Sequence, residues 1–264
     1  GLQALSERRN RQAPRREAWF TERTEGLAIS VRHEADLLHR QQGEFQRIEV
    51  FQTETFGKML VLDGVIALTE EDEFAYHEMM VHIPLNVHPK PQKVLVLGGG
   101  DGGICREVAR YPDVQQITVV EQDRQITATS QRFFPEIASS LQDLRVSLFF
   151  EDAGQFLSGQ EAGGYDVVVV DLPDPLAPEK FAESPELPEA IHKILKDNGM
   201  MVVQTGSPKI HASRLRHSYS ALRKVFGQQR VFPYLAWMPA YPAGTWSFAC
   251  CHKNDLKPQS SVVE

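Results

Sequence analysis

The amino-acid sequence predicts an α/β protein in which a doubly wound, mostly parallel sheet follows a small N-terminal β subdomain. From about residue 92 onward, short apolar segments alternate with helical segments, as in parallel sheets whose strands are joined by helices. Residues 18–70 instead contain short strand-like segments. A length of 264 residues, 42% of them hydrophobic, suits one large domain with a small appendage.

The composition excludes several classes of protein and partner. A formal net charge of −7 argues against non-specific binding of nucleic acid or anionic membranes and favours a cationic ligand. No apolar run reaches the roughly 18 residues that a membrane helix needs. The three cysteines (Cys105, Cys250 and Cys251) form no CxxC pair. We therefore expect neither a disulfide framework nor a zinc site, and we expect a reducing, cytoplasmic location.

The first 70 residues are predicted to form an arm followed by β-strands. Residues 1–17 carry five arginines among polar residues, which predicts a flexible basic arm. Strands are predicted over residues 27–33, 46–53, 58–62 and 65–69, within a β subdomain that spans 18–70. Asp63-Gly64 separates the last two strands and is a strong signal for a two-residue hairpin turn. The first residue is Gly1 rather than methionine, and we expect a trimmed N-terminus.

Residues 71–264 are predicted to form the larger domain, which opens with a helix over 72–87. His77 and His82 lie five residues apart in that helix and do not share one face, so no metal site is expected there. The predicted strands, of which the first four are apolar enough to be buried on both faces, span 93–97, 116–121, 145–150, 166–171, 200–204, 230–235 and 245–252. Helices are predicted between them over 103–110, 124–133, 153–160 and 186–196.

A glycine loop follows the first strand of this domain. Gly98, Gly100 and Gly103 form the pattern G-x-G-x-x-G between a buried strand and a helix. Glycine there permits a tight turn, close approach of a ligand and close helix–strand packing. Glu121 ends the next strand, where a carboxylate can accept hydrogen bonds from both hydroxyls of a ribose. These residues predict a nucleoside-bearing ligand; NAD and S-adenosyl compounds both fit.

Two aspartates near this loop narrow the ligand. Asp101 lies inside the loop, where its charge would repel a phosphate or a carboxylate and attract an amine. It therefore argues against a dinucleotide and against ordinary S-adenosylmethionine. Asp152 follows the third strand, at the corner that faces the adenine in folds of this type, and can accept from the exocyclic amine. Each aspartate also has a purely structural interpretation as the cap of the following helix.

Asp171 and Asp174 close the fourth strand of the sheet in a proline-stiffened loop. Ligands of open α/β sheets bind at the carboxyl ends of the strands. Two carboxylates three residues apart can hold a polyamine cation there, and one of them can take its proton. The alternative is turn chemistry alone, because Asp-Pro is a common turn pair.

Five segments within residues 18–253 carry a family resemblance. They are Thr55–Ile66, Asp72–Met80, the glycine loop Gly98–Gly103, Asp171-x-x-Asp-Pro175 and Tyr241-Pro-x-Gly244. Together they resemble the polyamine aminopropyltransferases, that is, spermidine synthase and its relatives. The resemblance implies a Rossmann-like, class I methyltransferase-like fold with a seven-stranded sheet. It also implies transfer of the aminopropyl group of decarboxylated S-adenosylmethionine to a diamine, with methylthioadenosine as the second product.

The resemblance also assigns expected roles to residues. Asp171 is expected to be the general base, with Tyr76 and Asp174 as further catalytic residues. Donor binding is expected at Gln46, Gly98, Gly100, Asp101, Glu121 (ribose), Asp152 (adenine), Ala153 and Asp171. Acceptor binding is expected at Trp19, Tyr76, His77, Asp171, Asp174, Gln204 and Tyr241. No cofactor and no metal are expected, and the implied assembly is a homodimer paired through the N-terminal β region.

Several residues depart from the family pattern. Leu172 and Pro173 stand where the family has two small polar residues, Ala177 stands for a glycine, and Ala67 stands where a glutamine is common in animal enzymes. Putrescine is the expected acceptor, with cadaverine, agmatine, diaminopropane and spermidine left open. A methyltransferase on the same sheet and a non-catalytic polyamine-binding relative are the alternatives. Asp101 argues against the first, and the retained Tyr76, Asp171, Asp174 and Tyr241 argue against the second.

Overall fold

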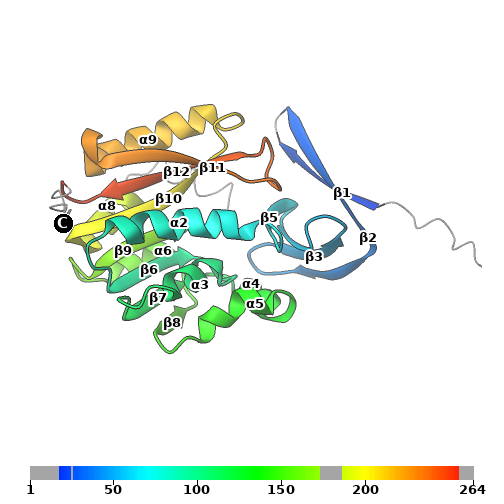
Figure 1. The fold of residues 1–264 in the computed structure, drawn as a ribbon, viewed down its shortest axis with the longest axis horizontal. Helices are drawn as coiled ribbons and strands as arrows, with labels where there is room; N and C mark the ends of the chain where they lie inside the picture. Colours follow the sequence, from blue (N-terminus) through cyan, green and yellow to red (C-terminus); the bar gives the residue numbers. More distant parts are fainter. Residues whose placement is uncertain (1–17, 25, 173–185, 256–264) are drawn as a thin grey trace, which may run out of the picture.

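The protein contains two sheets that are connected through α2 (Glu73–Val87), as Figure 1 shows. The computed structural model describes residues 18–24, 26–172 and 186–255. The predicted basic arm 1–17 and the residues Pro173, Asp174 and Ala177 lie outside the described residues. No helix of the described ranges is long and apolar enough to cross a membrane.

The N-terminal sheet has five antiparallel strands in sequential order. These are β1 (Ala18–Thr24), β2 (Leu27–Gln42), β3 (Arg47–Thr53), β4 (Lys58–Leu62) and β5 (Val65–Thr69). The predicted two-residue hairpin joins β4 to β5, with Leu62 paired to Val65. Asp63 and Gly64 have φ angles of 50° and 87°, as this type of turn requires.

Two features of this sheet differ from the sequence prediction. β1 was not predicted, and β2 continues to Gln42 rather than ending at His33. The inward-facing residues of β1 include the buried Glu22, so the strand does not alternate in the usual apolar-in, polar-out manner. In the second half of β2, Leu37 packs against the core of the N-terminal sheet, whereas Leu38 and Arg40 are exposed.

The second sheet has seven strands in the order β11-β12-β10-β9-β6-β7-β8. Strands β8, β7, β6, β9 and β10 are parallel, whereas β12 runs antiparallel to both β10 and β11. Their bounds are β6 (Lys93–Gly98), β7 (Gln116–Val120), β8 (Val146–Phe149), β9 (Tyr165–Asp171), β10 (Leu195–Gly206), β11 (Val231–Trp237) and β12 (Thr245–His252). The predicted doubly wound, mostly parallel seven-stranded fold with an N-terminal β subdomain is confirmed.

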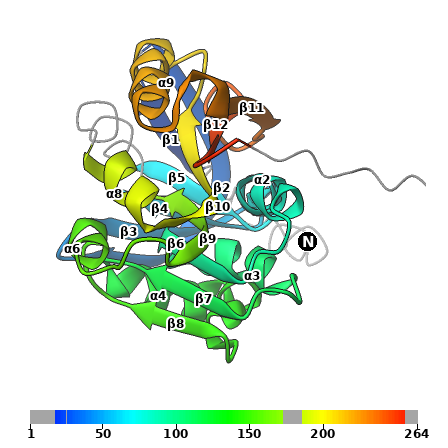
Figure 2. The same cartoon turned by 90° about the vertical axis from the view of Figure 1, so that its left-hand side faces the viewer.

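Helices cover both faces of the larger sheet (Figure 2). Alternate residues of one strand serve the two cores: Val167 and Val169 face α2 and α3 (Gly103–Ala109), whereas Val168 and Val170 face α6 (Ala153–Ser158), α8 (Glu186–Ile194) and α9 (Ala212–Phe226). Within the described ranges, the remaining helices are α4 (Arg124–Phe133), α5 (Pro135–Ala138), η1 (Ser139–Gln142) and η2 (Gln228–Arg230). α4 and α5 pack against β3–β5, which joins the two sheets around a cleft.

One prediction about the larger sheet is wrong, and one helix beside it was not predicted. The segment 145–150 is not buried on both faces: β8 is an edge strand, and Ser147 and Phe149 are exposed. An edge strand has one neighbour and fewer helices over it, so its outer residues stay accessible. The helix α9 was not predicted, although the apolar side chains of Leu215, Tyr219 and Leu222 recur at helical spacing along it.

Candidate active site

A cavity of about 470 Å³ lies between the two sheets, at the carboxyl edge of the parallel strands. Its walls come from the glycine loop, the start of α2, the ends of β9 and β10, strands β1, β4 and β5, and residues 210–214 and 241–242. The residues predicted from the sequence that line it are Tyr76, His77, Gly100, Asp101, Glu121, Asp171, Gln204 and Tyr241. The structure thus brings together side chains that are up to 165 positions apart in the sequence.

The glycine loop is shaped by close approaches that a larger residue could not make. A Cβ at Gly98, whose φ is +85°, would lie 1.9 Å from the backbone oxygen of Asp171. A Cβ at Gly100 would lie 2.6 Å from the Glu121 side chain, and one at Gly103 would lie 2.1 Å from the His77 ring. Glycine therefore lets the loop contact Asp171, Glu121 and His77 at once, which explains the motif in physical terms.

Glu121 is buried at the end of β7, with its side chain toward the glycine loop. It accepts hydrogen bonds from the backbone N–H groups of Gly100 (3.1 Å) and Asp123 (2.8 Å). Burial nevertheless raises the pKa of Glu121 to about 7. A polar ligand whose hydroxyls donate to this carboxylate would compensate for the burial of its charge.

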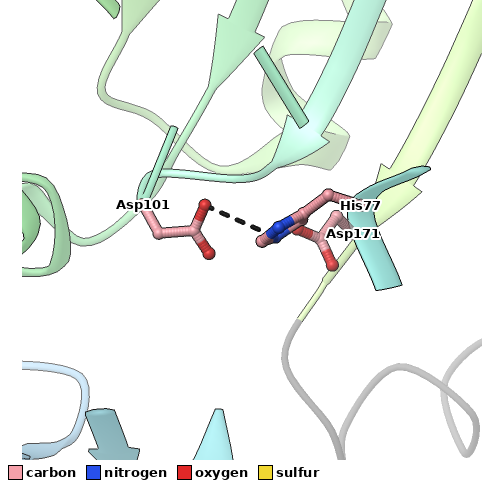
Figure 3. A group of neighbouring side chains, drawn as sticks. All are labelled: His77, Asp101 and Asp171. Carbon is pink, nitrogen blue, oxygen red and sulfur yellow. Dashed lines mark ion pairs between the residues drawn. The ribbon is translucent and has the colours of Figure 1, made fainter. Parts of the chain in front are cut away.

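His77 and Asp101 form the centre of the site (Figure 3). The Nε2 atom of His77 lies 3.8 Å from Oδ1 of Asp101, and that oxygen also accepts from the N–H of Gly103 at 2.7 Å. Burial alone would lower the pKa of His77, but Asp101 and Glu73 outweigh it and raise this pKa to about 10. Burial would raise the pKa of Asp101, but the same imidazolium holds it below its usual range. At neutral pH the two groups are therefore an ion pair.

Asp171 ends β9 beside this pair, and Figure 3 shows its carboxylate next to the His77 ring. The hydroxyl of Tyr76 donates to Oδ1 of Asp171 at 2.7 Å. Burial, together with the negative charge of Asp101, raises the pKa of Asp171 to about 6. Asp101 and Asp171 thus face one cavity with different tendencies to hold a proton, which is the usual signature of residues with separate chemical roles.

An aromatic wall stands beside these carboxylates. The hydroxyl of Tyr241 donates to the Ala67 backbone oxygen at 2.7 Å, and its ring lies 6.2 Å from that of Tyr76. The indole N–H of Trp246 donates to Oε1 of Gln204 at 2.9 Å, which fixes the orientation of the buried amide. The cavity can therefore hold an apolar methylene chain against the rings while polar groups contact its ends.

The loop that carries Tyr241 is fastened to the start of α2 by Asp72. Its Oδ2 atom accepts from the N–H of Ala240 at 2.8 Å, and its Oδ1 atom accepts from the hydroxyl of Thr69 at 2.5 Å. The sequence analysis did not single out Asp72, although it directly precedes the helix of the family motif. These contacts hold the two tyrosines in their relative positions.

Other predicted residues lie outside the cavity lining. Gln46 donates to Oδ2 of Asp123 at 3.2 Å, and Asp152 caps α6 by accepting from the N–H of Gln155 at 3.0 Å. Ala153 begins α6 next to Asp152. Gly98 packs against the Asp171 backbone behind the loop. Asp174 belongs to the part of the chain that the structure does not describe.

Trp19 in β1 lies outside the cavity lining, and its contact with the acceptor stays a prediction. Its side chain is 54% exposed and is not among those that line the cavity. Further along the same strand, Glu22, Arg23 and Thr24 line the cavity. Glu22 is 4% exposed, lines the cavity and accepts from the N–H of Ile66 at 2.8 Å. Glu22 was not predicted as a site residue, because β1 was not recognised as a strand from the sequence.

The described residues contain two groups of potential metal ligands, one of which is His77, Asp101 and Asp171. In this group, Nδ1 of His77 donates to Glu73, and Nε2 lies 3.8 Å from Oδ1 of Asp101. In the other group, the carboxylate of Glu107 is held by Arg106 and Arg110 at 2.8 Å each. Both arrangements suit an organic cation or ion pairs better than a metal ion, and the sequence prediction that no metal is bound stays a prediction.

The fold and the cavity together define a class of protein: open α/β proteins whose ligand site lies at the carboxyl edge of a doubly wound sheet. Comparison with known proteins identifies the family. The chain belongs to the spermine/spermidine synthase family, whose model for the spermine/spermidine synthase domain matches residues 73–260. A second model, described as the spermidine synthase tetramerisation domain, matches residues 18–70.

Relatives from distant organisms agree with this assignment. The chain is 41% identical to the polyamine aminopropyltransferase of Moorella thermoacetica, over 89% of this chain and 82% of the relative. It is 39% identical to that of Methanocaldococcus jannaschii, over 89% and 80%. The crystal structure of spermidine synthase from Thermotoga maritima superposes with a TM-score of 0.86 at 29% identity, covering 96% of this chain and 85% of that one.

A second solved structure carries information about the ligand of a relative. It is a spermidine synthase in complex with the transition state analogue AdoDATO, with a TM-score of 0.85 and 28% identity over 96% of this chain and 85% of that one. The predicted family and the prediction of an enzyme are confirmed: the chain is a polyamine aminopropyltransferase.

Proposed function

We propose that this enzyme transfers the aminopropyl group of decarboxylated S-adenosylmethionine to putrescine and forms spermidine and methylthioadenosine. The observation that carries the proposal is the pair Asp101 and Asp171, two carboxylates that face one cavity beside the glycine loop. This placement attracts a nucleoside donor that ends in an amine and repels one that ends in a carboxylate. The transition state analogue bound to the related spermidine synthase supports the same ligand class.

The donor would lie along the carboxyl edge of the sheet. Glu121 would bind the ribose hydroxyls, and the lack of a side chain at Gly100 would allow the ribose to approach the loop closely. Gln46, Asp152 and Ala153 would bind the adenosine moiety from outside the present cavity lining. Asp101 and Asp171 would bind the amine of the aminopropyl group and align its terminal carbon with the acceptor. Alignment of this kind is itself a large source of rate enhancement.

The acceptor amine must lose a proton before it attacks. For an amine with a pKa of about 10.4, deprotonation at pH 7 costs about 4.6 kcal/mol. Asp171 would accept this proton. Its raised pKa of about 6 is closer to the pKa of the amine than that of an ordinary aspartate is, which makes the proton transfer less unfavourable. The nitrogen then bonds to the aminopropyl carbon, the carbon–sulfur bond breaks, and its electron pair neutralises the sulfonium. No covalent enzyme intermediate, cofactor or metal is required.

Other side chains would position the acceptor. Tyr76, Gln204 and Tyr241 would orient its chain, and Asp174, which follows β9 in the sequence, would assist. His77 would contact the reacting amines through its ring. The second ammonium of a diamine would be bound by Glu22, the buried carboxylate on the N-terminal sheet side of the cavity. We further propose a cytoplasmic enzyme that assembles as a homodimer; the match to a tetramerisation domain supports an oligomer.

The experiment that tests the proposal measures release of methylthioadenosine from decarboxylated S-adenosylmethionine with each of five acceptors: putrescine, cadaverine, agmatine, diaminopropane and spermidine. The expected result is the highest kcat/KM with putrescine. A higher kcat/KM with another amine would refute putrescine as the acceptor while leaving the transfer reaction intact. Donor binding without release for every acceptor would instead support a polyamine-binding protein that does not catalyse the reaction.

A further inference from the structure

A chain of alternating charges leads from the partly exposed Arg106 on α3 to the reaction centre. Arg106 forms a bidentate pair with Glu73, through Nη1 at 2.6 Å and Nη2 at 2.9 Å. Oε2 of Glu73 accepts from Nδ1 of His77 at 2.5 Å, and Nε2 of His77 faces Asp101 at 3.8 Å. Glu73 and His77 lie four residues apart on α2, whereas Arg106 reaches them from another helix. The reaction proposed above does not use Glu73 or Arg106.

This geometry assigns a definite state to the imidazole. A carboxylate can only accept, so Glu73 requires a proton on Nδ1, and Nε2 is left as the atom that faces the cavity. The ring cannot turn away, because Gly103 packs directly against it. Burial would raise the pKa of Glu73, but the bonds from His77 and Arg106 outweigh it and keep this carboxyl ionised. His77 is thus a fixed, charged group whose second proton is directed at Asp101.

A substrate ammonium at Asp101 would compete with that proton. Both cations would lie within a few ångströms of the same carboxylate, in a buried site where like charges repel strongly. We propose that binding of the donor's amine at Asp101 expels the Nε2 proton of His77 to solvent, and that Glu73 and Arg106 set the pH range in which this exchange occurs. The inference rests on the proposed function, because it requires a ligand amine at Asp101.

The two positioning residues act on His77 with opposite signs. The negative charge of Glu73 stabilises the imidazolium directly. Arg106 also bonds to the Glu73 carboxylate, and its positive charge weakens the interaction of that carboxylate with the His77 ring. Removal of Arg106 should therefore make His77 retain its proton more strongly. All charged or titratable groups that the described residues place against His77 enter this balance: Glu73 from α2, Asp101 from the glycine loop, Asp171 from β9, Tyr76 beside it, and Arg106 behind Glu73.

The test counts protons released on ligand binding by isothermal titration calorimetry in buffers of different ionisation enthalpy, from pH 6 to pH 10. Two unreactive ligands are compared. Aminopropylthioadenosine carries the amine but no sulfonium, and methylthioadenosine carries neither. The wild type should release about one proton near pH 8 with the first ligand and none with the second. Release by neither, although the amine ligand binds, would overturn the inference.

Variants then identify the source of the proton. Glu73→Gln keeps an oxygen that can accept from Nδ1 but removes the charge, and should move the pH window of release downward by one unit or more. Arg106→Gln should move the window upward. Glu78→Gln removes a carboxylate from the exposed side of the same helix and should leave the window unchanged. Shifts of Glu73→Gln and Arg106→Gln in the same direction, or no shift, would show that these residues are merely structural.

Two further outcomes distinguish failure of this inference from failure of the proposed function. If His77→Gln still releases a proton with the amine ligand, the proton does not come from His77 and the inference is refuted. If neither nucleoside binds to the wild type at any pH, the proposed function fails instead, and this result is distinct from binding without release. Because Arg106 is partly exposed, its variant remains informative even where Glu73→Gln reduces folding.

Discussion

The hydroxyl of Tyr76 should control the acid side of the pH–rate profile. It donates a hydrogen bond of 2.7 Å to Asp171, and this bond lowers a pKa that burial and Asp101 raise to about 6. A hydrogen bond to a charged group contributes about 1.5–3 kcal/mol, and one pKa unit corresponds to about 1.4 kcal/mol. The pKa depends on how much more strongly this hydrogen bond stabilises ionised than protonated Asp171, and the protonated carboxyl retains part of the bond. Tyr76→Phe should therefore raise the pKa of Asp171 by about one unit.

The sign of the effect follows from the role of the base. Asp171 accepts a proton only when it is ionised, so a higher pKa removes activity at low pH and leaves it at high pH. With pKa values of about 6 and about 7, the ratio of wild-type to variant rate should grow about fivefold between pH 9 and pH 6. The rate is followed as release of methylthioadenosine at low acceptor concentration, where kcat/KM is measured. Protonation of the free acceptor affects both enzymes equally and cancels in the ratio.

Tyr241→Phe is the matched control. It removes a hydroxyl from the same cavity, but that hydroxyl donates to the backbone oxygen of Ala67, which does not titrate in this range. It should lower the rate by a similar factor at every pH. If Tyr76→Phe also lowers the rate uniformly from pH 6 to pH 9, Asp171 is not the base whose pKa the hydroxyl tunes, and the mechanism proposed above is refuted.

The site supports further predictions. Asp171→Asn should reduce transfer at least hundredfold while donor binding, measured by calorimetry, persists, because the amide cannot accept the proton; near-normal turnover would defeat the assignment. Gly103→Ala would place a Cβ 2.1 Å from the His77 ring, so it should destabilise the fold by about 1–3 kcal/mol, measured by denaturant unfolding. Asp72→Asn should raise the acceptor KM severalfold with the donor KM unchanged, because the Tyr241 loop loosens. Dialysis against a chelator should leave turnover unchanged; restored activity on addition of a metal would contradict the metal-free mechanism.

Local signals in the sequence predicted local structure well. Asp63-Gly64 predicted a hairpin because two consecutive residues with positive φ restrict the choice to a few residue types. The glycine loop predicted the ligand-facing turn for a similar reason, and the structure adds which atoms exclude a Cβ. β9 could be recognised because both its faces are buried, which leaves a continuous apolar run.

Contacts between distant segments could not be predicted in this way. That Glu22 lines the cavity whereas Trp19 does not is decided by the pairing of β1 with β2 rather than by the segment itself. The pair Glu73 and His77 could have been recognised from its four-residue spacing on a helix. Arg106, in contrast, approaches Glu73 from a helix 33 positions away, and only the packing of α3 on α2 brings them together.

The different chemical roles of Asp101 and Asp171 follow from their surroundings, because both residues are aspartates. Asp101 and Asp171 face the same cavity, but the imidazolium of His77 lowers the pKa of the first, whereas burial and the charge of Asp101 raise that of the second. An ionised group suits the binding of an ammonium, and a group that titrates near neutrality suits proton transfer. A uniformly acidic cavity would bind the amine tightly and leave it protonated. The pairing of His77 with Asp101 therefore helps to separate the roles of the two aspartates in the enzyme before ligand binding.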